Sequence, residues 1–344
     1  MAPIRVLLTN DDGPPSRDSP FILGLFVYLC TRGSALNPVV LPSSQKSWIG
    51  KAYHIKEKIY GRYYYPLILH SDARSEVSDA SRPLKEGELG EWILLDATPA
   101  TCANIAIHNI FPGEIDLVIS GPNFGRNTSS AFVLSSGTVG AAMSSSLSLI
   151  RSIALSYGVF TRHFPTDYVQ PSHELSLKII GKLWNQWGKD PSGLRNGEVD
   201  LYNVNIPLVP EILREGGMEV AWTRIWRNSY TSLFQPQDSE TSTMPAGPDA
   251  RVVAKNSSSS QEQNQVVSAP DLAFKFSPQM SPLVDPPISS LPYGTDAWAV
   301  HHAKASVTPL RTSFAEPGSD SMVLVGESFD NSPSVGEAGR AFKL

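Results

Sequence analysis

The sequence is poor in cysteine, has no excess of positive charge and contains no apolar run long enough to cross a membrane. Its 344 residues include two cysteines, Cys30 and Cys102, with no Cys-x-x-Cys spacing for a metal. The net charge of −5 argues against a nucleic-acid partner, and every apolar run falls short of the roughly twenty residues of a spanning helix. Because no signal-peptide pattern is present, we expect a cytoplasmic protein with reduced, buried thiols, although a disulfide between the two remains an alternative.

Three common motifs are also missing. No Gly-Lys-Ser/Thr occurs, which argues against a P-loop, and the first predicted strand is not followed by a Gly-x-Gly-x-x-Gly dinucleotide fingerprint. A Gly-x-Ser-x-Gly elbow is absent too, which argues against an α/β-hydrolase. The seven histidines have no ligand spacing. We expect them to be surface or core residues, with His301 and His302 in a late strand.

What is present is an alternation of short apolar runs with helix-like segments. Runs rich in Val, Ile and Leu that end at turn residues are typical of buried parallel strands. The predicted strands are residues 4–9, 38–42, 91–96, 115–120, 153–156 and 201–207. The predicted helices are residues 20–30, 98–109 and 172–187, and a further helix of small residues follows the loop that begins at Ser136. This order predicts an α/β fold, a Rossmann-like, doubly wound and mostly parallel sheet with a C-terminal β-rich extension.

The composition changes towards the C-terminus. Residues 235–290 include a stretch rich in Pro, Ser, Gln and Asn without apolar periodicity, which is typical of a flexible insertion. We therefore assign residues 1–234 to the α/β domain and the start of its extension, and residues 291–316 to strands that return to the fold. The polar residues 317–344 form a tail.

The residues that say most about chemistry follow the first strand directly, as Asn10-Asp11-Asp12-Gly13. In open α/β sheets, ligands bind just beyond the carboxyl ends of the strands. Two adjacent carboxylates there repel each other unless a positive charge lies between them, and a divalent cation is a common solution. The alternative is that Asp11 and Asp12 form a polar turn that caps the next helix.

Other loops at the same predicted sheet edge carry neutral oxygens. Ser47 lies in the polar loop after the second strand, and Asn123 lies in a Gly-rich stretch after the strand at 115–120. Carboxylate, hydroxyl and amide oxygens suit a hard cation such as Mg²⁺ or Mn²⁺. Serine and asparagine are also common turn residues, so the pattern allows both interpretations.

An anion site is predicted at Ser136-Gly137-Thr138, which precedes an Ala-rich helix. Free N–H groups and the positive end of the helix dipole favour an anion at such a terminus. The same geometry without a ligand is an ordinary serine helix cap.

Five motifs in this order resemble the SurE family of metal-dependent phosphatases and nucleotidases. They are Thr-Asn-Asp-Asp-Gly at 9–13, Gln-x-Ser at 45–47, Asp-x-Thr-Pro-Ala at 96–100, Ser-Gly-x-Asn-x-Gly-x-Asn at 120–127 and Ser-Gly-Thr-Val-x-Ala-Ala at 136–142. Asn-Val-Asn-Ile-Pro at 203–207 and Ser-Val-Thr-Pro-Leu at 306–310 are similar to the family's later elements.

The resemblance implies roles for particular residues of this chain. Metal ligands would be Asp11, Asp12, Ser47 and Asn123, and substrate-phosphate contacts would be Asn127, Ser136, Gly137 and Thr138. The catalytic set would be Asp11, Asp12, Asn127, Ser136 and Thr138. The family fold implies a homodimer or homotetramer that exchanges C-terminal segments.

We therefore expect a phosphomonoesterase that hydrolyses nucleoside monophosphates or other small phosphate esters with one Mg²⁺ or Mn²⁺ per site. Whether Asp12 is only a ligand or also moves a proton stays open at this stage. Two alternatives remain: a non-catalytic protein that binds a nucleotide or phosphate, and a regulatory protein that recruits a partner through residues 235–290.

Overall fold

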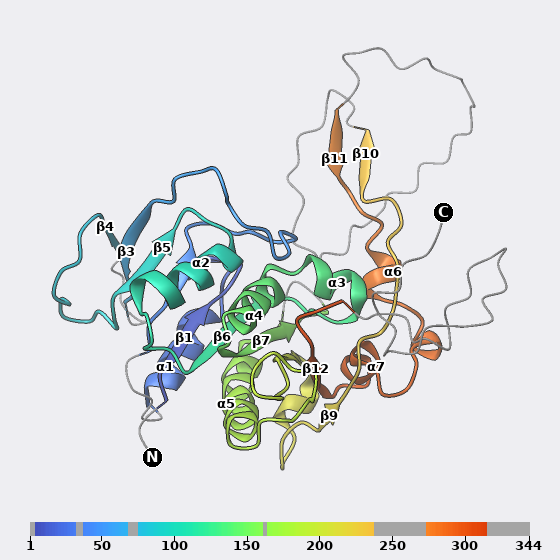
Figure 1. The fold of residues 1–344 in the computed structure, drawn as a ribbon. Coiled ribbons are helices and arrows are strands. Elements are labelled where there is room, and N and C mark those ends of the chain that lie inside the picture. The colour runs from blue at the N-terminus through green and yellow to red at the C-terminus, as the bar shows by residue number, and fades with distance from the viewer. Residues whose placement is uncertain (1–3, 32–36, 68–74, 161–163, 237–272, 315–344) are drawn as a thin grey trace, which may run out of the picture.

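The computed structural model describes residues 4–31, 37–67, 75–160, 164–236 and 273–314 (Figure 1). Most of the predicted insertion (237–272) and nearly all of the predicted tail lie outside the described residues. Within the described part, no helix is long and apolar enough to cross a membrane.

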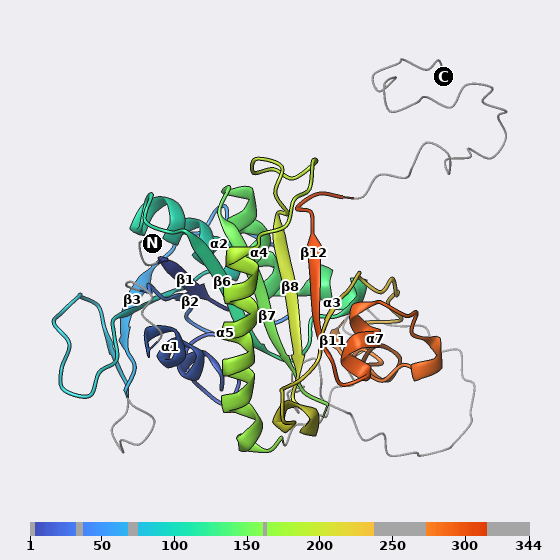
Figure 2. The same cartoon turned by 90° about the horizontal axis from the view of Figure 1, so that it is seen from below.

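A six-stranded sheet forms the centre of the molecule (Figure 2). In spatial order its strands are β1 (Val6–Thr9), β6 (Leu117–Phe124), β7 (Arg151–Gly158), β8 (Leu201–Pro207), β12 (Ala305–Leu310) and β9 (Val220–Trp222). The first four are parallel, β12 runs antiparallel to β8, and β9 is parallel to β12. The last two strands form the C-terminal β extension.

A smaller sheet continues this one beyond β1. It contains β2 (Val40–Pro42), β5 (Trp92–Leu95), β3 (Gly61–Tyr65) and β4 (Glu76–Ser78) in that spatial order. A parallel bridge between Leu8 and Val39 joins it to β1. The chain thus leaves β1 on one side towards β2 and returns on the other side at β6, which makes the ends of β1 and β6 the topological switch point.

Helices cover both faces of the sheet. On one face are α1 (Ile22–Thr31) and α5 (Val169–Asn185), and on the other are α2 (Pro99–Ile105), continued by the π-helix η1 (Ala106–Ile110), and α4 (Gly137–Leu147). The side-chain alternation of β1 accounts for this layering: Leu8 belongs to the core cluster of α1 and α5, whereas Leu7 packs with Cys102 on α2. The predicted doubly wound α/β fold is confirmed.

Three local predictions are wrong. The Gly-rich stretch is a loop only beyond Phe124, because β6 continues to that residue. Gly121 requires glycine, since its φ is +126° and a Cβ would lie 2.0 Å from the carbonyl oxygen of Leu155. His301 and His302 lie at the end of helix α7 (Asp296–His301), not in a strand. Cys30 is exposed rather than buried, although both cysteines are free, as predicted.

The structure also shows elements that the sequence did not predict. Helix α3 (Ser129–Ser135) occupies the segment between the Gly-rich stretch and α4. Short 3₁₀ helices lie at η2 (Thr166–Tyr168), η3 (Pro210–Leu213) and η5 (Ile288–Ser290).

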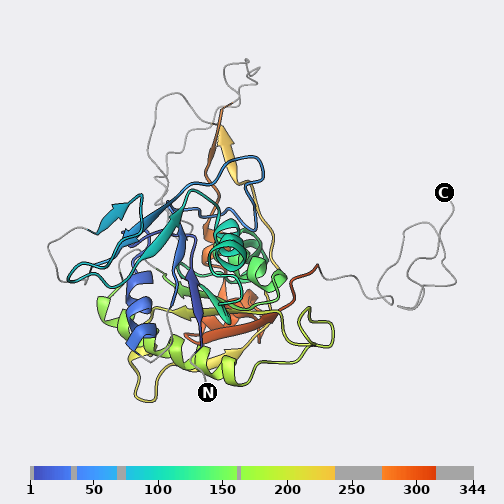
Figure 3. The ribbon, with the colours of Figure 1, turned by 60° about the vertical axis from the view of Figure 1, so that its left-hand side comes forward.

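The two described flanks of the insertion pair with each other. Strand β10 (Phe234–Pro236) is antiparallel to β11 (Phe274–Phe276), and this ribbon projects from the α/β body near α3 (Figure 3). Helix α6 (Ser281–Val284) follows, and its Leu283 is buried against α3. The last part of the stretch that composition assigned to the insertion therefore packs on the domain.

Candidate active site

The predicted site residues gather at the switch point of the sheet. Asp11 and Asp12 follow β1, and Asn123 lies next to the last residue of β6, the strand beside β1. The loop after β2 is drawn in by a hydrogen bond of 2.7 Å from the N–H of Lys46 to the carbonyl oxygen of Asp11. Parallel strands therefore deliver these loops to one edge, as the sequence pattern predicts.

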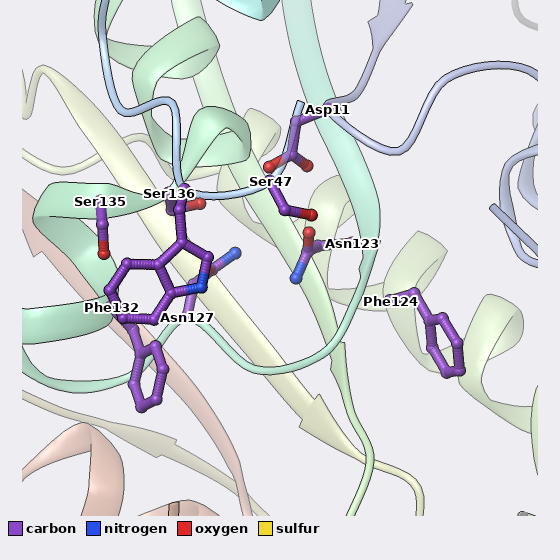
Figure 4. Close-up of a pocket in the computed structure, with 9 residues that line it drawn as sticks. Asp11, Ser47, Asn123, Phe124, Asn127, Phe132, Ser135 and Ser136 are labelled. Atoms are coloured by element: carbon purple, nitrogen blue, oxygen red, sulfur yellow. The ribbon is translucent and has the colours of Figure 1, made fainter. Parts of the chain in front are cut away.

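A small, open hollow lies at this edge (Figure 4). Its lining residues are Asp11, Ser47, Trp48, Asn123, Phe124, Asn127, Phe132, Ser135 and Ser136. Five of these were predicted from the sequence as ligands or phosphate contacts, namely Asp11, Ser47, Asn123, Asn127 and Ser136.

Asp11 is 3% exposed and lies against the start of α4. Its Oδ1 accepts a hydrogen bond of 2.5 Å from the Thr138 hydroxyl. Burial raises the pKa of this carboxyl, while the Thr138 hydroxyl and the backbone amides of Gly137 and Thr138 partly offset the rise. The anion at this helix terminus is thus the carboxylate of Asp11 itself.

Asp12 is 4% exposed, and its Oδ2 accepts a 2.7 Å hydrogen bond from the N–H of Phe124. Burial, and next the charge of Asp11, hold the pKa of Asp12 well above its usual range. No positive side chain among the described residues lowers the pKa of either carboxyl. The pair is therefore a buried concentration of negative charge without a protein cation to balance it.

The Asn123 amide is oriented by two contacts. Its Nδ2 donates to the carbonyl oxygen of Gly125 at 2.7 Å, and its Oδ1 accepts from the Thr138 hydroxyl at 3.2 Å. The amide oxygen of Asn123 thus faces the Thr138 hydroxyl, which also contacts Asp11. Ser47 lines the same hollow, so three of the four predicted metal ligands, Asp11, Ser47 and Asn123, surround one space, whereas Asp12 does not line it.

This donor set fits a hard divalent cation. It consists of carboxylate, amide and hydroxyl oxygens around two unbalanced negative charges, which is the chemistry that Mg²⁺ and Mn²⁺ prefer. The described residues contain no group of three or more His, Cys, Asp or Glu side chains arranged so that it could hold a metal ion. A site here would accordingly rest on two acidic residues, neutral oxygens and water.

The predicted phosphate contacts divide into two groups. Asn127 lines the hollow and is held by two strands of the sheet. Its N–H donates to Asn205 Oδ1 on β8 at 2.7 Å, and its Nδ2 donates to Ser156 Oγ on β7 at 2.8 Å. Ser136 also lines the hollow, and its Oγ accepts from the N–H of Val139 at 3.1 Å. The alternative of a helix cap is thus realised at Ser136.

Gly137 and Thr138 do not line the hollow. Gly137 allows Asp11 to approach, because a Cβ there would lie 2.7 Å from the Cβ of Asp11. The single hydroxyl proton of Thr138 is directed at Asp11 and Asn123. In this structure Thr138 positions two predicted ligands rather than facing the open space.

Four lining residues were not predicted from the sequence: Trp48, Phe124, Phe132 and Ser135. Trp48 directly follows the predicted ligand Ser47, and this adjacency was the signal available. Ser135 likewise adjoins the predicted contact Ser136, whereas Phe132 lies within the unpredicted helix α3, where the sequence offered no comparable signal.

Comparison with known protein families shows to which family the chain belongs. The family model described as "Survival protein SurE" matches residues 6–232. The chain belongs to the SurE family. The family match covers the whole switch-point site and ends before the β10–β11 ribbon.

Curated SurE relatives are named 5'-nucleotidases. The chain is 30% identical to "5'-nucleotidase SurE" of Methanocella arvoryzae over 234 residues, which cover 67% of this chain and 75% of that relative. It is 32% identical to the protein of the same name from Synechocystis over 233 residues, 67% of this chain and 70% of that protein. At family level the chain is thus related to phosphatases and nucleotidases.

A longer relative has a different name. The chain is 31% identical over 339 residues to "Probable tubulin--tyrosine ligase PBY1" of Saccharomyces cerevisiae, covering 90% of this chain but 41% of that protein. The chain therefore spans less than half the length of this relative. The ligase in its name belongs to that protein and is not carried over to this chain.

The fold has a solved counterpart. The SurE protein of Aquifex aeolicus superposes with a TM-score of 0.55 at 22% identity, covering 90% of this chain and 94% of that one. This likeness supports the architecture alone.

Proposed function

We propose that this chain is a divalent-metal-dependent phosphomonoesterase that hydrolyses nucleoside monophosphates or other small phosphate esters. The observation that carries the proposal is the buried pair Asp11 and Asp12, whose pKa values are both raised and whose charge no described cation balances. Such a pair is costly to the fold unless a ligand compensates it. The SurE relatives named 5'-nucleotidases support the choice of a phosphate ester.

In this proposal Asp11, Asp12, Ser47 and Asn123 hold one Mg²⁺ or Mn²⁺. When bound, the ion supplies charge that stabilises the phosphoryl oxygens and activates a water molecule. The amide of Asn127 and the hydroxyl of Ser136 face the same hollow and would contact the remaining phosphate oxygens. The balanced reaction is a phosphate monoester plus water to an alcohol and inorganic phosphate.

The positions of Gly137 and Thr138 adjust the predicted division of work. Thr138 would act by fixing the ligands Asp11 and Asn123, since its hydroxyl proton is directed at them. Gly137 would act by leaving room for the Asp11 side chain. Asp12 is hydrogen-bonded to the backbone of Phe124, which fits a ligand held in one orientation.

The first test is phosphate release from nucleoside monophosphates and an aryl phosphate with Mg²⁺, with Mn²⁺ and with a chelator. We expect release that the chelator stops and that Asp11→Asn lowers by more than about a hundredfold. The matched control is Asp167→Asn, because Asp167 is exposed on η2. Full metal-dependent activity in Asp11→Asn would refute the metal assignment.

A non-catalytic phosphate-binding protein is the second candidate. It predicts a folded protein that binds a nucleotide or phosphate but releases no phosphate with either metal. The buried carboxylate pair favours the enzyme, because a protein without turnover gains nothing from retaining two adjacent buried negative charges. A homodimer or homotetramer and a cytoplasmic location remain predictions, which light scattering and fractionation would test.

A further inference from the structure

Part of the lining of the hollow is aromatic. Trp48 and Phe132 line it together with the polar residues, and Trp48 is partly exposed. The phosphate contacts proposed above leave these rings without a role. An aromatic face beside a polar centre is the usual arrangement of a pocket that binds a planar apolar group at one end and a charged group at the other.

The indole of Trp48 is held in place by rings from three separate segments. Its ring centroid lies 5.9 Å from Phe132 on α3, 5.9 Å from Tyr230 and 5.2 Å from Phe276 on β11. The Tyr230 hydroxyl donates to the carbonyl oxygen of Ala131 at 2.5 Å, which ties this cluster to α3. The ring of Trp48 is thus fixed before any ligand arrives, which lowers the entropic cost of stacking on it.

The backbone of Trp48 is also unusual. Its φ is +61°, in the left-handed region that a bulky residue rarely adopts. Such a conformation costs free energy and persists where the surrounding structure imposes it, which is common at ligand-binding sites. It occurs here immediately after Ser47, so the same turn presents a predicted ligand and the indole to one hollow.

We propose that Trp48 is a specificity-determining residue, on which the planar ring of the substrate's alcohol part, a nucleobase or an aryl ring, stacks. The proposal rests on the proposed function and deepens it, because it names the side chain that selects aromatic over aliphatic phosphate esters. Sequence-tolerant stacking of this kind gives preference for any flat ring and little discrimination among bases.

The test compares Trp48→Gly with Trp48→Phe. Glycine accepts the positive φ without strain, so this truncation removes the ring while easing the backbone. Phenylalanine keeps a smaller flat ring. The matched control is Trp222→Ala, since Trp222 is 62% exposed on the edge strand β9. Thermal unfolding of each variant checks that it is folded.

For each variant, kcat/KM is measured with 5'-AMP, with an aryl phosphate and with glycerol phosphate. The quantity compared is the kcat/KM of each aromatic substrate divided by that of glycerol phosphate. We expect Trp48→Gly to lower this ratio roughly tenfold, with partial recovery in Trp48→Phe and no change in Trp222→Ala. An unchanged ratio in Trp48→Gly, in a protein that still releases phosphate, overturns the inference and leaves the proposed function intact.

Calorimetric binding separates the two proposals if no phosphate is released. With Mn²⁺ present, the inference expects 5'-AMP to bind the wild-type protein more tightly than inorganic phosphate does, and Trp48→Gly to abolish that preference. Equal affinity for the two compounds in the wild-type protein, or binding of neither, overturns the inference. Tighter binding of 5'-AMP without turnover supports the inference while refuting the phosphomonoesterase.

Discussion

The hydroxyl of Thr138 donates a 2.5 Å hydrogen bond to Oδ1 of Asp11, across 127 residues of sequence. The bond joins the first turn of α4 to the end of β1, and the same hydroxyl lies 3.2 Å from Oδ1 of Asn123. The Thr138 hydroxyl thus connects the residues that follow β1 with the end of the neighbouring strand β6. The geometry of the predicted metal ligands depends on it.

Removing this proton should weaken metal binding. In Thr138→Val the Asp11 carboxylate loses its closest side-chain donor and Asn123 loses a partner, so both ligands gain freedom. A hydrogen bond to a charged group contributes about 1.5–3 kcal/mol, which predicts at least tenfold weaker Mn²⁺ binding by titration calorimetry. Thr138→Ser keeps the hydroxyl and should restore most of the affinity. Affinity within twofold of wild type in Thr138→Val would contradict the positioning role.

Adding one carbon at Gly137 should disrupt the same contact. A Cβ there would lie 2.7 Å from the Asp11 Cβ and 2.9 Å from its Oδ2. Gly137→Ala should therefore displace Asp11 and lower both activity and the free energy of unfolding. The overpacking cost is about 1–3 kcal/mol, measured by urea unfolding.

Gly181 provides the matched control, since it lies within helix α5 and a Cβ there would meet nothing within 4 Å. Gly181→Ala should raise the free energy of unfolding by up to about 1 kcal/mol through helix propensity and leave activity unchanged. Equal effects of the two substitutions would contradict the steric argument at Gly137.

The stability contribution of Asp296 should fall as pH rises. This buried carboxylate accepts backbone N–H groups from Ser129 and Trp226, and burial raises its pKa to about 6 from 3.8. The native state therefore binds more protons than the unfolded chain between those values. Ionisation across pH 4 to 6 should cost about 3 kcal/mol of unfolding free energy.

Asp296→Asn removes this titration. The unfolding free energy of wild type minus that of the variant, measured from pH 4 to 7, should decrease with pH. Asparagine cannot accept from both Ser129 and Trp226 in the same way, because its NH₂ donates, so the variant should also be less stable at pH 4. A difference that stays constant across this range would contradict the buried, titrating carboxyl.

His173 should give the opposite pH dependence. It is 2% exposed, its Nδ1 lies 2.9 Å from the Tyr157 hydroxyl, and burial lowers its pKa to about 4 from 6.5. The unfolded chain binds the extra proton first, so the native state should lose about 3 kcal/mol as pH falls from 6.5 to 4. Urea unfolding across this range would measure the loss.

His173→Asn should remove that component while retaining a partner for Tyr157. The control is His302→Asn, since His302 is exposed just beyond α7. We expect the control to keep the full loss of stability at low pH. If His302→Asn and His173→Asn flatten the curve equally, burial of His173 is not the cause.

The sequence predicted the switch-point site because its signals are local. The apolar run of β1 ends directly at Asp11 and Asp12, and parallel strands deposit their carboxyl ends at one edge whatever follows them. Ser47 was predicted in the same way, from its loop after the second strand, whereas the role of Asn127 was implied by the resemblance to the SurE family. The return of residues 291–316 to the fold was also predicted, and β12 lies in that range.

The remaining features depend on partners that are distant in sequence. Helix α3 has few local signals and is fixed from outside, through Asp296 at its start and Tyr230 along its length. The Gly-rich stretch continues β6 because it pairs with β7, up to Phe124 opposite Tyr157. The residues of α3 and of the Gly-rich stretch do not by themselves indicate these distant partners.

The sequence by itself thus determined the layered α/β fold and which residues could supply oxygen ligands, because hydrophobic periodicity and turn chemistry act over a few residues. The tertiary structure alone decided that Thr138 is directed at Asp11 and that Trp48 meets Tyr230 and Phe276 beside the hollow. Those contacts join segments that no short-range pattern connects, and packing selects them only once the whole chain has folded.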